Sequence, residues 1–144
     1  MASCARWVVD TNVLVSAFIG SGTPARVIEA AVEEAVLLFT SRVLLDELEA
    51  TLGKKKLARY VSATGMTPAQ LVAHYRRLCT LVTARRLAHP MCRDADDDAV
   101  LACALAARAD LIVTGDDDLL SMKHFNDIPI VTAAQAIHAP FGPR

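Results

Sequence analysis

Most of the aspartates of this chain are concentrated in two short runs. Seven of the eleven lie either in Asp94-Ala-Asp96-Asp97-Asp98 or in Asp116-Asp117-Asp118. Another, Asp10, closes an apolar stretch near the N-terminus. Carboxylates packed this densely repel one another, and protons or cations relieve the repulsion at neutral pH. If the fold brings the three places together, the ligand that suits them is a hard divalent cation such as Mg²⁺ or Mn²⁺.

The basic residues are distributed just as unevenly. The net charge is −1 at pH 7, so overall charge does not make the chain a polyanion binder. Residues 50–93 contain no Asp or Glu but hold nine of the fifteen basic residues, including Lys54, Lys55, Lys56, Arg76 and Arg77. A basic surface beside a metal-loaded acidic pocket suits a phosphodiester substrate. Solvated helix faces, or a docking surface for an acidic partner, explain the same pattern, and charge alone does not separate these interpretations.

Length and composition favour a single globular domain over residues 1–144, with 53% hydrophobic and 22% charged residues. No apolar stretch reaches the ~18 residues that span a bilayer, and the N-terminus does not resemble a secretory signal. The four cysteines show no paired spacing, which favours free thiols over disulfides or zinc ligands. We therefore expect a cytoplasmic protein that does not enter a membrane.

Apolar runs and capping residues predict strands that alternate with helices. Short apolar runs predict buried strands at 7–9, 36–40, 111–114 and 128–131. Helical spacing and N-cap residues predict helices at 13–19, 24–34, 41–52, 67–82, 94–108 and 132–138. Continuously apolar strands between helices indicate a parallel sheet that is covered on both faces. The predicted fold class is therefore α/β, with three layers in the order α/β/α.

Four carboxylates from four segments are expected to converge at one edge of this sheet. Ligands of parallel α/β sheets bind beyond the carboxyl ends of the strands. Asp10 and Asp116 each follow a predicted strand, and Asp98 lies in the first turn of a helix, where a carboxylate is favoured. Glu47 lies about two turns into the helix after the second strand, so its side chain can lean back towards the edge. Such a cluster can hold one or two metal ions and ionise a water for attack on a phosphodiester.

The individual acids also have simpler interpretations. Asp10 can start a turn, Glu47 can be a solvated helix residue, and Asp94, Asp96 and Asp97 can serve as helix caps and first-turn partners of the helix dipole. Asp117 and Asp118 can be loop residues. The convergence of acids at several strand ends is harder to explain in this way.

Asp97 and Asp98 are adjacent, so only one of them can face the pocket well. Asp98 shares a helix face with Leu101, Ala102 and Leu105, which should turn it towards the sheet. We therefore predict that Asp98 is the third acid and that Asp97 is its competitor.

Five segments, in this order, resemble the motifs of the PIN domain family. They are Val8-Val-Asp10-Thr-Asn12-Val-Leu-Val-Ser16, Val43-Leu-Leu-Asp-Glu47-Leu, Arg93-Asp-Ala-Asp-Asp-Asp98-Ala-Val-Leu, Ala109-Asp-Leu-Ile-Val-Thr114-Gly-Asp116-Asp-Asp118-Leu-Leu and Ile128-Pro-Ile-Val-Thr132. The resemblance spans nearly the whole chain and is weakest over residues 53–93. The group that it resembles most comprises bacterial toxins of toxin–antitoxin systems.

This resemblance implies a single-strand-directed endoribonuclease that depends on Mg²⁺ or Mn²⁺, built on a central parallel sheet of about five strands. It implies that Asp10, Glu47, Asp98 and Asp116 are the catalytic and metal-binding acids. Asn12 and Thr114 match positions that support the site by hydrogen bonds, and Asp118 matches a frequent fifth acid. It also implies a homodimer and a small antitoxin protein that reaches into the active site.

Two other functions are compatible with parts of the pattern. A phosphatase of the haloacid-dehalogenase type would need a second Asp two residues after its nucleophile, but Asn12 stands there and cannot deliver a proton. A catalytically silent PIN-like module would bind RNA or protein without cleavage, although the complete acidic set argues against it.

Overall fold

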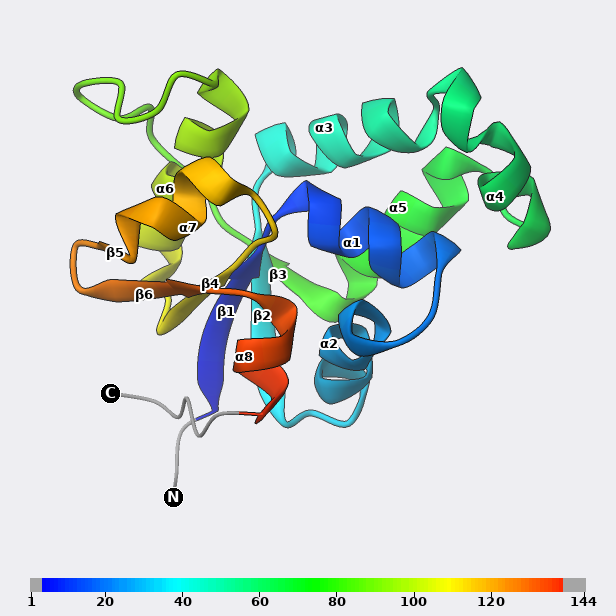
Figure 1. Ribbon diagram of the computed structural model, residues 1–144, viewed down its shortest axis with the longest axis horizontal. Coiled ribbons are helices and arrows are strands. Elements are labelled where there is room, and N and C mark those ends of the chain that lie inside the picture. The colour runs from blue at the N-terminus through cyan, green and yellow to red at the C-terminus, as the bar shows by residue number, and fades with distance from the viewer. Residues whose placement is uncertain (1–3, 139–144) are drawn as a thin grey trace.

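Residues 4–138 are described by the structure, a computed structural model in which helices cover both faces of a central sheet (Figure 1). The sheet contains six strands in the order β3-β2-β1-β4-β6-β5. These strands are β1 (Ala5–Val9), β2 (Val36–Thr40), β3 (Cys79–Leu81), β4 (Leu111–Val113), β5 (His124–Phe125) and β6 (Ile128–Val131). All neighbours are parallel except β5, which pairs with β6 in the antiparallel sense. The predicted three-layer α/β/α class is confirmed, and the sheet has six strands where the apolar runs predicted four and the resemblance implied about five.

Each of the six predicted helices has a counterpart in the structure. The helices are α1 (Thr11–Ile19), α2 (Thr23–Val32), α3 (Arg42–Leu52), α4 (Ala58–Ala63), α5 (Pro68–Leu78), α6 (Ala95–Ala107), α7 (Asp117–Met122) and α8 (Ala133–His138), with the 3₁₀ turn η1 (Lys55–Leu57) between α3 and α4. Helices α4 and α7 were not predicted. Among residues 4–138, no helix combines the length and apolar character needed to cross a membrane.

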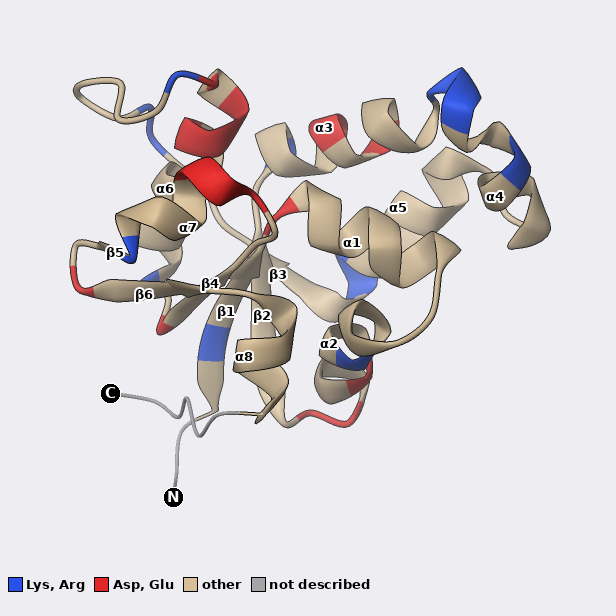
Figure 2. Cartoon of the chain, viewed as in Figure 1, with Lys and Arg blue, Asp and Glu red and all other residues tan. Residues whose placement is uncertain are grey.

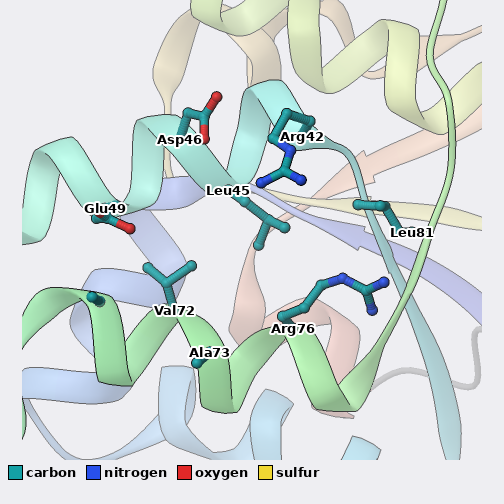
Figure 3. Close-up of a pocket in the computed structure, with 9 residues that line it drawn as sticks. Arg42, Leu45, Asp46, Glu49, Val72, Ala73, Arg76 and Leu81 are labelled. Carbon is teal, nitrogen blue, oxygen red and sulfur yellow. The ribbon is translucent and has the colours of Figure 1, made fainter.

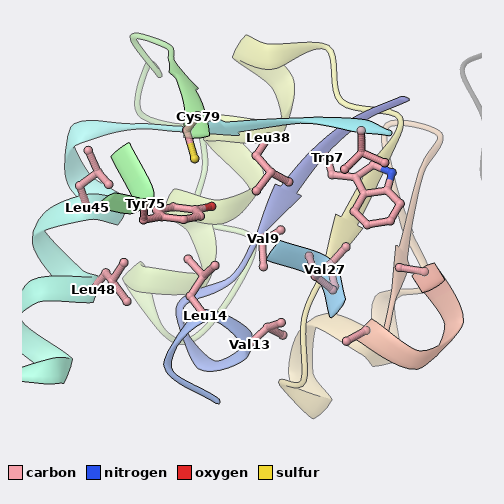
Figure 4. Close-up of a cluster of buried hydrophobic side chains, with 14 of the residues drawn as sticks. Trp7, Val9, Val13, Leu14, Val27, Leu38, Leu45, Leu48, Tyr75 and Cys79 are labelled. Carbon is pink, nitrogen blue, oxygen red and sulfur yellow. The ribbon is translucent and has the colours of Figure 1, made fainter. Parts of the chain in front are cut away.

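Two hydrophobic clusters, one on each face, explain why the strands read as continuously apolar. On β1, Trp7 and Val9 pack into the cluster formed with α1, α2, α3, α5 and α8, which Figure 4 shows. Val8 points to the opposite face of the sheet, into the second cluster, which α6 forms mainly with residues of β2, β4, β5 and β6. Neighbouring strand residues face opposite sides of a sheet, so burial of both faces requires apolar residues at every position.

Local predictions failed where long-range pairing or an unnoticed cap decided the structure. The predicted helix over 67–82 begins with the expected Thr67–Gln70 capping box but ends at Leu78. The next three residues form β3 because they pair with β2, a partner that helical spacing cannot reveal. Asp117 and Asp118 were interpreted as possible loop residues. They instead begin α7, because the Asp116 side chain caps that helix.

The strand order creates a switch point between β1 and β4. From β1 the chain proceeds outwards to β2 and β3, and then returns to β4 on the other side of β1. Val9 lies opposite Val113 in the ladder, and the Asp10 amide donates to the Val113 carbonyl at 2.8 Å. The residues that follow the two strands are therefore held side by side, at the place where doubly wound sheets bind ligands.

We predict that Ile112→Ala lowers the free energy of unfolding by about 2–5 kcal/mol. Ile112 is fully buried on the central strand β4, and its truncation leaves a cavity beneath the site. Urea unfolding followed by circular dichroism measures the change. Leu37→Ala is the matched control, since Leu37 lies on β2 but is 43% exposed. Equal losses for the two variants would contradict this assignment of the core.

Candidate metal centre

Asp10 is the most deeply buried acid at the switch point, with only 5% of its surface exposed. It is the N-cap of α1, and its Oδ1 accepts the Thr11 amide at 2.7 Å. Its Oδ2 accepts the Thr114 hydroxyl at 2.7 Å. Both oxygens are thereby fixed in position, and each keeps a lone pair for another ligand. Burial raises the pKa of Asp10, although these two hydrogen bonds oppose the rise.

Thr114 connects the acids that follow β1 and β4. Its hydroxyl donates to Asp10 and accepts the Asp116 amide at 3.0 Å. The residue is fully buried, so its two partners fix the direction of the hydroxyl hydrogen. The family resemblance implied hydrogen bonds from Thr114 to the site, and these are the hydrogen bonds that the structure gives it.

Asn12 fastens α1 to the loop after β4. Its Oδ1 accepts the Gly115 amide at 3.1 Å, which ties the start of α1 to the residue just before Asp116. The Asn12 side-chain amide is sufficient for this contact. A phosphatase of the haloacid-dehalogenase type would need a carboxylic acid at the same position. The supporting role predicted for Asn12 thus corresponds to a contact in the structure.

The third acid in the pocket is Asp97, which corrects our expectation that Asp98 faces it. One carboxylate oxygen each from Asp10, Asp97 and Asp116 lies within 4.8 Å of the others. Asp98 instead accepts the amides of Met91 and Cys92 at 3.0 and 2.9 Å, and so secures the loop before α6.

The packing of α6 gives the physical reason. Asp97 continues the helix stripe of Val100, Ala104 and Ala107, all of which are fully buried. The stripe that we assigned to Asp98 ends at Leu105, which is 39% exposed. Both stripes are apolar in the sequence, so only their burial in the structure separates Asp97 from Asp98.

Glu47 lies beside this trio but outside its tightest contacts. Its Oε2 is buried and has no hydrogen-bond partner among the described residues. Burial is the main cause that raises the pKa of Glu47 to about 7, and repulsion by Asp96 and Asp10 adds to it while Thr11 opposes it. The influence of Thr11 and Asp96 was not anticipated, since no role in the site was assigned to Thr11 and Asp96 was interpreted only as a helix-start residue.

Asp116 and Asp118, both in the second aspartate run, have different surroundings. Asp116 is the N-cap of α7, where its Oδ1 accepts the Asp118 amide at 3.0 Å. The Asp118 carboxylate is 54% exposed and lies 3.5 Å from the Arg93 guanidinium. Asp116 therefore belongs to the pocket, whereas the Asp118 side chain pairs with a basic residue at its rim. Asp94 is the N-cap of α6, as one of the predicted alternatives proposed.

The three acids cannot all be ionised without a neutralising partner. Burial raises the pKa of Asp97 to about 7, and the nearby Asp116 and Asp10 carboxylates contribute to the rise. At neutral pH a proton or a cation must offset the repulsion. The donor set consists only of carboxylate oxygens, which are the ligands preferred by Mg²⁺ and Mn²⁺. The site therefore fits a hard divalent cation held by Asp10, Asp97 and Asp116, with Glu47 as an adjacent carboxylate.

The sequence pattern of the PIN domain family matches residues 6–118, which include all of these acids. The chain belongs to the PIN domain family. PIN domains are generally metal-dependent nucleases, and the acidic trio of this chain could hold a metal ion. The chain is also 30% identical over 120 residues to an uncharacterized protein of Methanocaldococcus jannaschii. The aligned region covers 83% of this chain and 76% of the relative.

The basic residues selected from the sequence lie outside the acidic pocket of this PIN domain (Figure 2). Lys54, Lys55 and Lys56 are exposed beyond the C-terminal end of α3. Arg76 and Arg77 are exposed in the last turn of α5. The acid-free middle of the chain therefore forms a flank of the molecule and contributes no side chain to the trio.

We predict that Asp97→Asn stabilises the metal-free protein at about pH 8 by on the order of 1–2 kcal/mol. Folded Asp97 keeps its proton up to about pH 7, whereas in the unfolded chain it loses it near its ordinary value of 3.8. Between these limits the folded state binds more protons, so stability falls as the pH rises. Urea unfolding in EDTA should show the gain at about pH 8 and little difference at about pH 4.5. If Asp97→Asn is less stable than wild type at about pH 8, ionised Asp97 is not destabilised by the neighbouring carboxylates and the prediction is wrong.

We also predict that Asp97→Ala weakens Mn²⁺ binding by on the order of 100-fold, because it removes a ligand. Asp98→Ala is the matched control and should cost less than about tenfold, since it removes only contacts to the loop. Isothermal titration calorimetry measures both affinities. A loss confined to the Asp98 variant would restore the original assignment.

Proposed function

We propose that this PIN domain is a divalent-metal-dependent endoribonuclease that cleaves single-stranded RNA by attack of water. The observation that supports the proposal most strongly is the convergence of Asp10, Asp97 and Asp116 at the switch point of the sheet. A divalent cation, when bound, would lower the pKa of a water molecule and neutralise the charge that develops on the phosphoryl group. This chemistry needs only hard oxygen ligands and an adjacent proton acceptor, and both are present.

The protein residues have separate tasks in this proposal. Asp10, Asp97 and Asp116 would hold the cation, and Thr114 keeps the first of these carboxylates oriented through its hydroxyl. Glu47, with a pKa of about 7 and an unpartnered Oε2, can accept a proton near neutral pH. Asn12 and Asp98 contact backbone amides, so they maintain the loops that frame the pocket.

Single-stranded RNA is the proposed substrate because the family resemblance implies it and because exposed basic residues follow or precede the helices that carry the acids. Arg93 lies at the rim beside Asp118, and Lys54, Lys55 and Lys56 follow the C-terminal end of α3, the helix that carries Glu47. Phosphate groups on either side of the cut bond would be attracted to these positions, whereas the acidic pocket alone repels RNA unless a cation is bound.

The biological role that we propose is that of the toxin of a type II toxin–antitoxin system. The resemblance of the four acidic segments to bacterial PIN-domain toxins supports it, and a small cognate antitoxin would be the inhibitory partner. Induced expression of wild type should arrest bacterial growth, and Asp10→Asn should not. If wild type and Asp10→Asn both arrest growth, the toxicity does not depend on the acidic site.

The nuclease activity is tested with a labelled, unstructured RNA. Wild type should cleave it with Mg²⁺ or Mn²⁺ and lose activity in EDTA. Asp10→Asn should fold yet lose on the order of 100-fold or more in rate, because a neutral amide replaces a ligand. Cleavage by the variant at the wild-type rate would exclude this site. Metal-independent RNA binding without cleavage by wild type would instead identify a catalytically silent PIN-like module.

The lysines at the end of α3 provide a test of substrate binding. Reversal of Lys54, Lys55 and Lys56 to Glu should weaken RNA binding and reduce the salt dependence by about two counterions. Arg26→Glu with Lys123→Glu is the control, since both side chains are exposed on other elements. Fluorescence anisotropy at several salt concentrations measures both. Equal effects in the control would show that only net charge matters.

A further inference from the structure

Within residues 4–138, Tyr60 is the only Phe, Trp or Tyr that is exposed, at 50% of its surface. It lies on α4, the short helix beyond the C-terminal end of α3 (Figure 1). On the inner side of this segment, Val61 is buried in the core and Leu57 packs against the same cluster. These two side chains hold the segment in place, so the Tyr60 ring is left on the outer surface and contributes little to the core.

Basic side chains accompany this ring. The Arg59 Cζ lies over it, 5.8 Å from the ring centroid. Lys56 precedes Tyr60 by four residues in the continuous segment of η1 and α4, which is about one helical turn, and Lys55 stands in the same relation to Arg59. In the described part of the chain, none of these three cations forms an ion pair. The surface around Tyr60 therefore carries positive charge that no carboxylate neutralises.

The groove between α3 and α5 has a different charge pattern. It is bordered by Arg42 and Arg76, but also by Asp46 and Glu49 (Figure 3). Phosphates placed there would be repelled by two carboxylates. By contrast, η1 and α4 carry basic residues and no acidic one (Figure 2). Of these two surfaces, only the one around Tyr60 suits a polyanion.

Two helices lead from the acidic pocket to this surface. Helix α1 begins directly after Asp10, and α4 packs against it (Figure 1). Helix α3 carries Glu47 and ends at Leu52, five residues or about 8 Å further along its axis. The turn η1 and α4 follow beyond that end. A strand whose cut bond lies at the acids would therefore reach Tyr60 with a neighbouring nucleotide and not with the nucleotides that flank the bond.

An aromatic ring among cations is the combination that binds single-stranded nucleic acid. The cations attract the phosphates, and an unpaired base stacks on the ring, whatever its identity. Cation–π attraction to Arg59 would help to hold the Tyr60 ring in position for such a base. The bases of an RNA duplex are already stacked and paired, so this surface would favour unpaired segments.

We infer that Tyr60, with Arg59 and Lys56, forms a stacking site for one base of single-stranded RNA, at a distance from the bond that the acidic pocket would cut. The inference rests on the proposed RNA substrate and adds to it a residue that distinguishes unpaired from paired segments. Tyr60 is a binding residue in this account and takes no part in the chemistry. Its removal should therefore weaken RNA binding and leave Mn²⁺ binding at the acids unchanged.

Two substitutions of Tyr60 separate stacking from other roles. Fluorescence anisotropy with a labelled, unstructured RNA in EDTA measures binding without cleavage. Tyr60→Ala should weaken binding on the order of tenfold, whereas Tyr60→Phe, which keeps the ring, should stay within about twofold of wild type. The salt dependence should be the same in all three proteins, because no charge is removed. Val32→Ala is the matched control, since Val32 is 61% exposed on α2, and it should bind as wild type does.

A tryptophan at this position would report the stacking directly. Trp7 is the single Trp of the chain and is buried on β1, so its emission should change little when RNA binds. The indole introduced by Tyr60→Trp can still stack on a base. Addition of the unstructured RNA should quench its emission with the same midpoint that anisotropy gives, and a duplex of the same length should quench it much less.

Several results would overturn the inference. One is RNA binding by Tyr60→Ala at the wild-type affinity, and another is an equal loss for Tyr60→Phe, which would show that the ring is not what binds. A third is unchanged emission of the Tyr60→Trp variant when anisotropy shows that it is saturated with RNA. Failure of the proposed function gives a different result. If wild type binds RNA but does not cleave it with Mg²⁺ or Mn²⁺, the nuclease proposal is wrong, while weaker binding by Tyr60→Ala alone still supports the stacking site.

Discussion

The interaction on which this structure depends is the repulsion among three carboxylates that the central strands hold together. Asp10 and Asp116 follow neighbouring parallel strands, and Asp97 is brought against them by the first turn of α6. The fold cannot relax by moving these groups apart, since the strands and α6 are anchored in fully buried packing on both faces. The protein can therefore reduce the repulsion only by binding protons or a cation. Burial is the main cause that raises the pKa of Asp97 and of Glu47, and repulsion by the neighbouring carboxylates adds to it.

The surrounding contacts keep the acids in place against this repulsion. Thr114 donates to Asp10 and accepts from the Asp116 amide, so one buried hydroxyl links two strand ends. Asn12 and Asp98 each hold a backbone segment at the rim. These contacts help to determine the distances between the acids. The site is thus built from a few local hydrogen bonds on a rigid frame, at the expense of stability in the metal-free protein.

Much of this arrangement could be predicted because it follows from local rules. Continuous apolar strands predicted the covered parallel sheet, and strand-end positions predicted that Asp10 and Asp116 converge. The choice between Asp97 and Asp98 failed because it depends on about 100° of helix rotation, which the packing of Val100 and Ala104 against the sheet determines. Strand β3 was missed because its pairing with β2 is a long-range contact. The groove between α3 and α5 could not be foreseen either, since the relative position of two helices is a tertiary property.

The most direct test of the central claim is an anomalous difference map from crystals grown with Mn²⁺. The account predicts a peak within ligand distance of carboxylate oxygens of Asp10, Asp97 and Asp116, at about 2.0–2.2 Å. Asp98 should remain bound to the amides of the loop before α6. A manganese ion coordinated by Asp98 rather than Asp97, or no peak at the switch point of the sheet, would contradict the account.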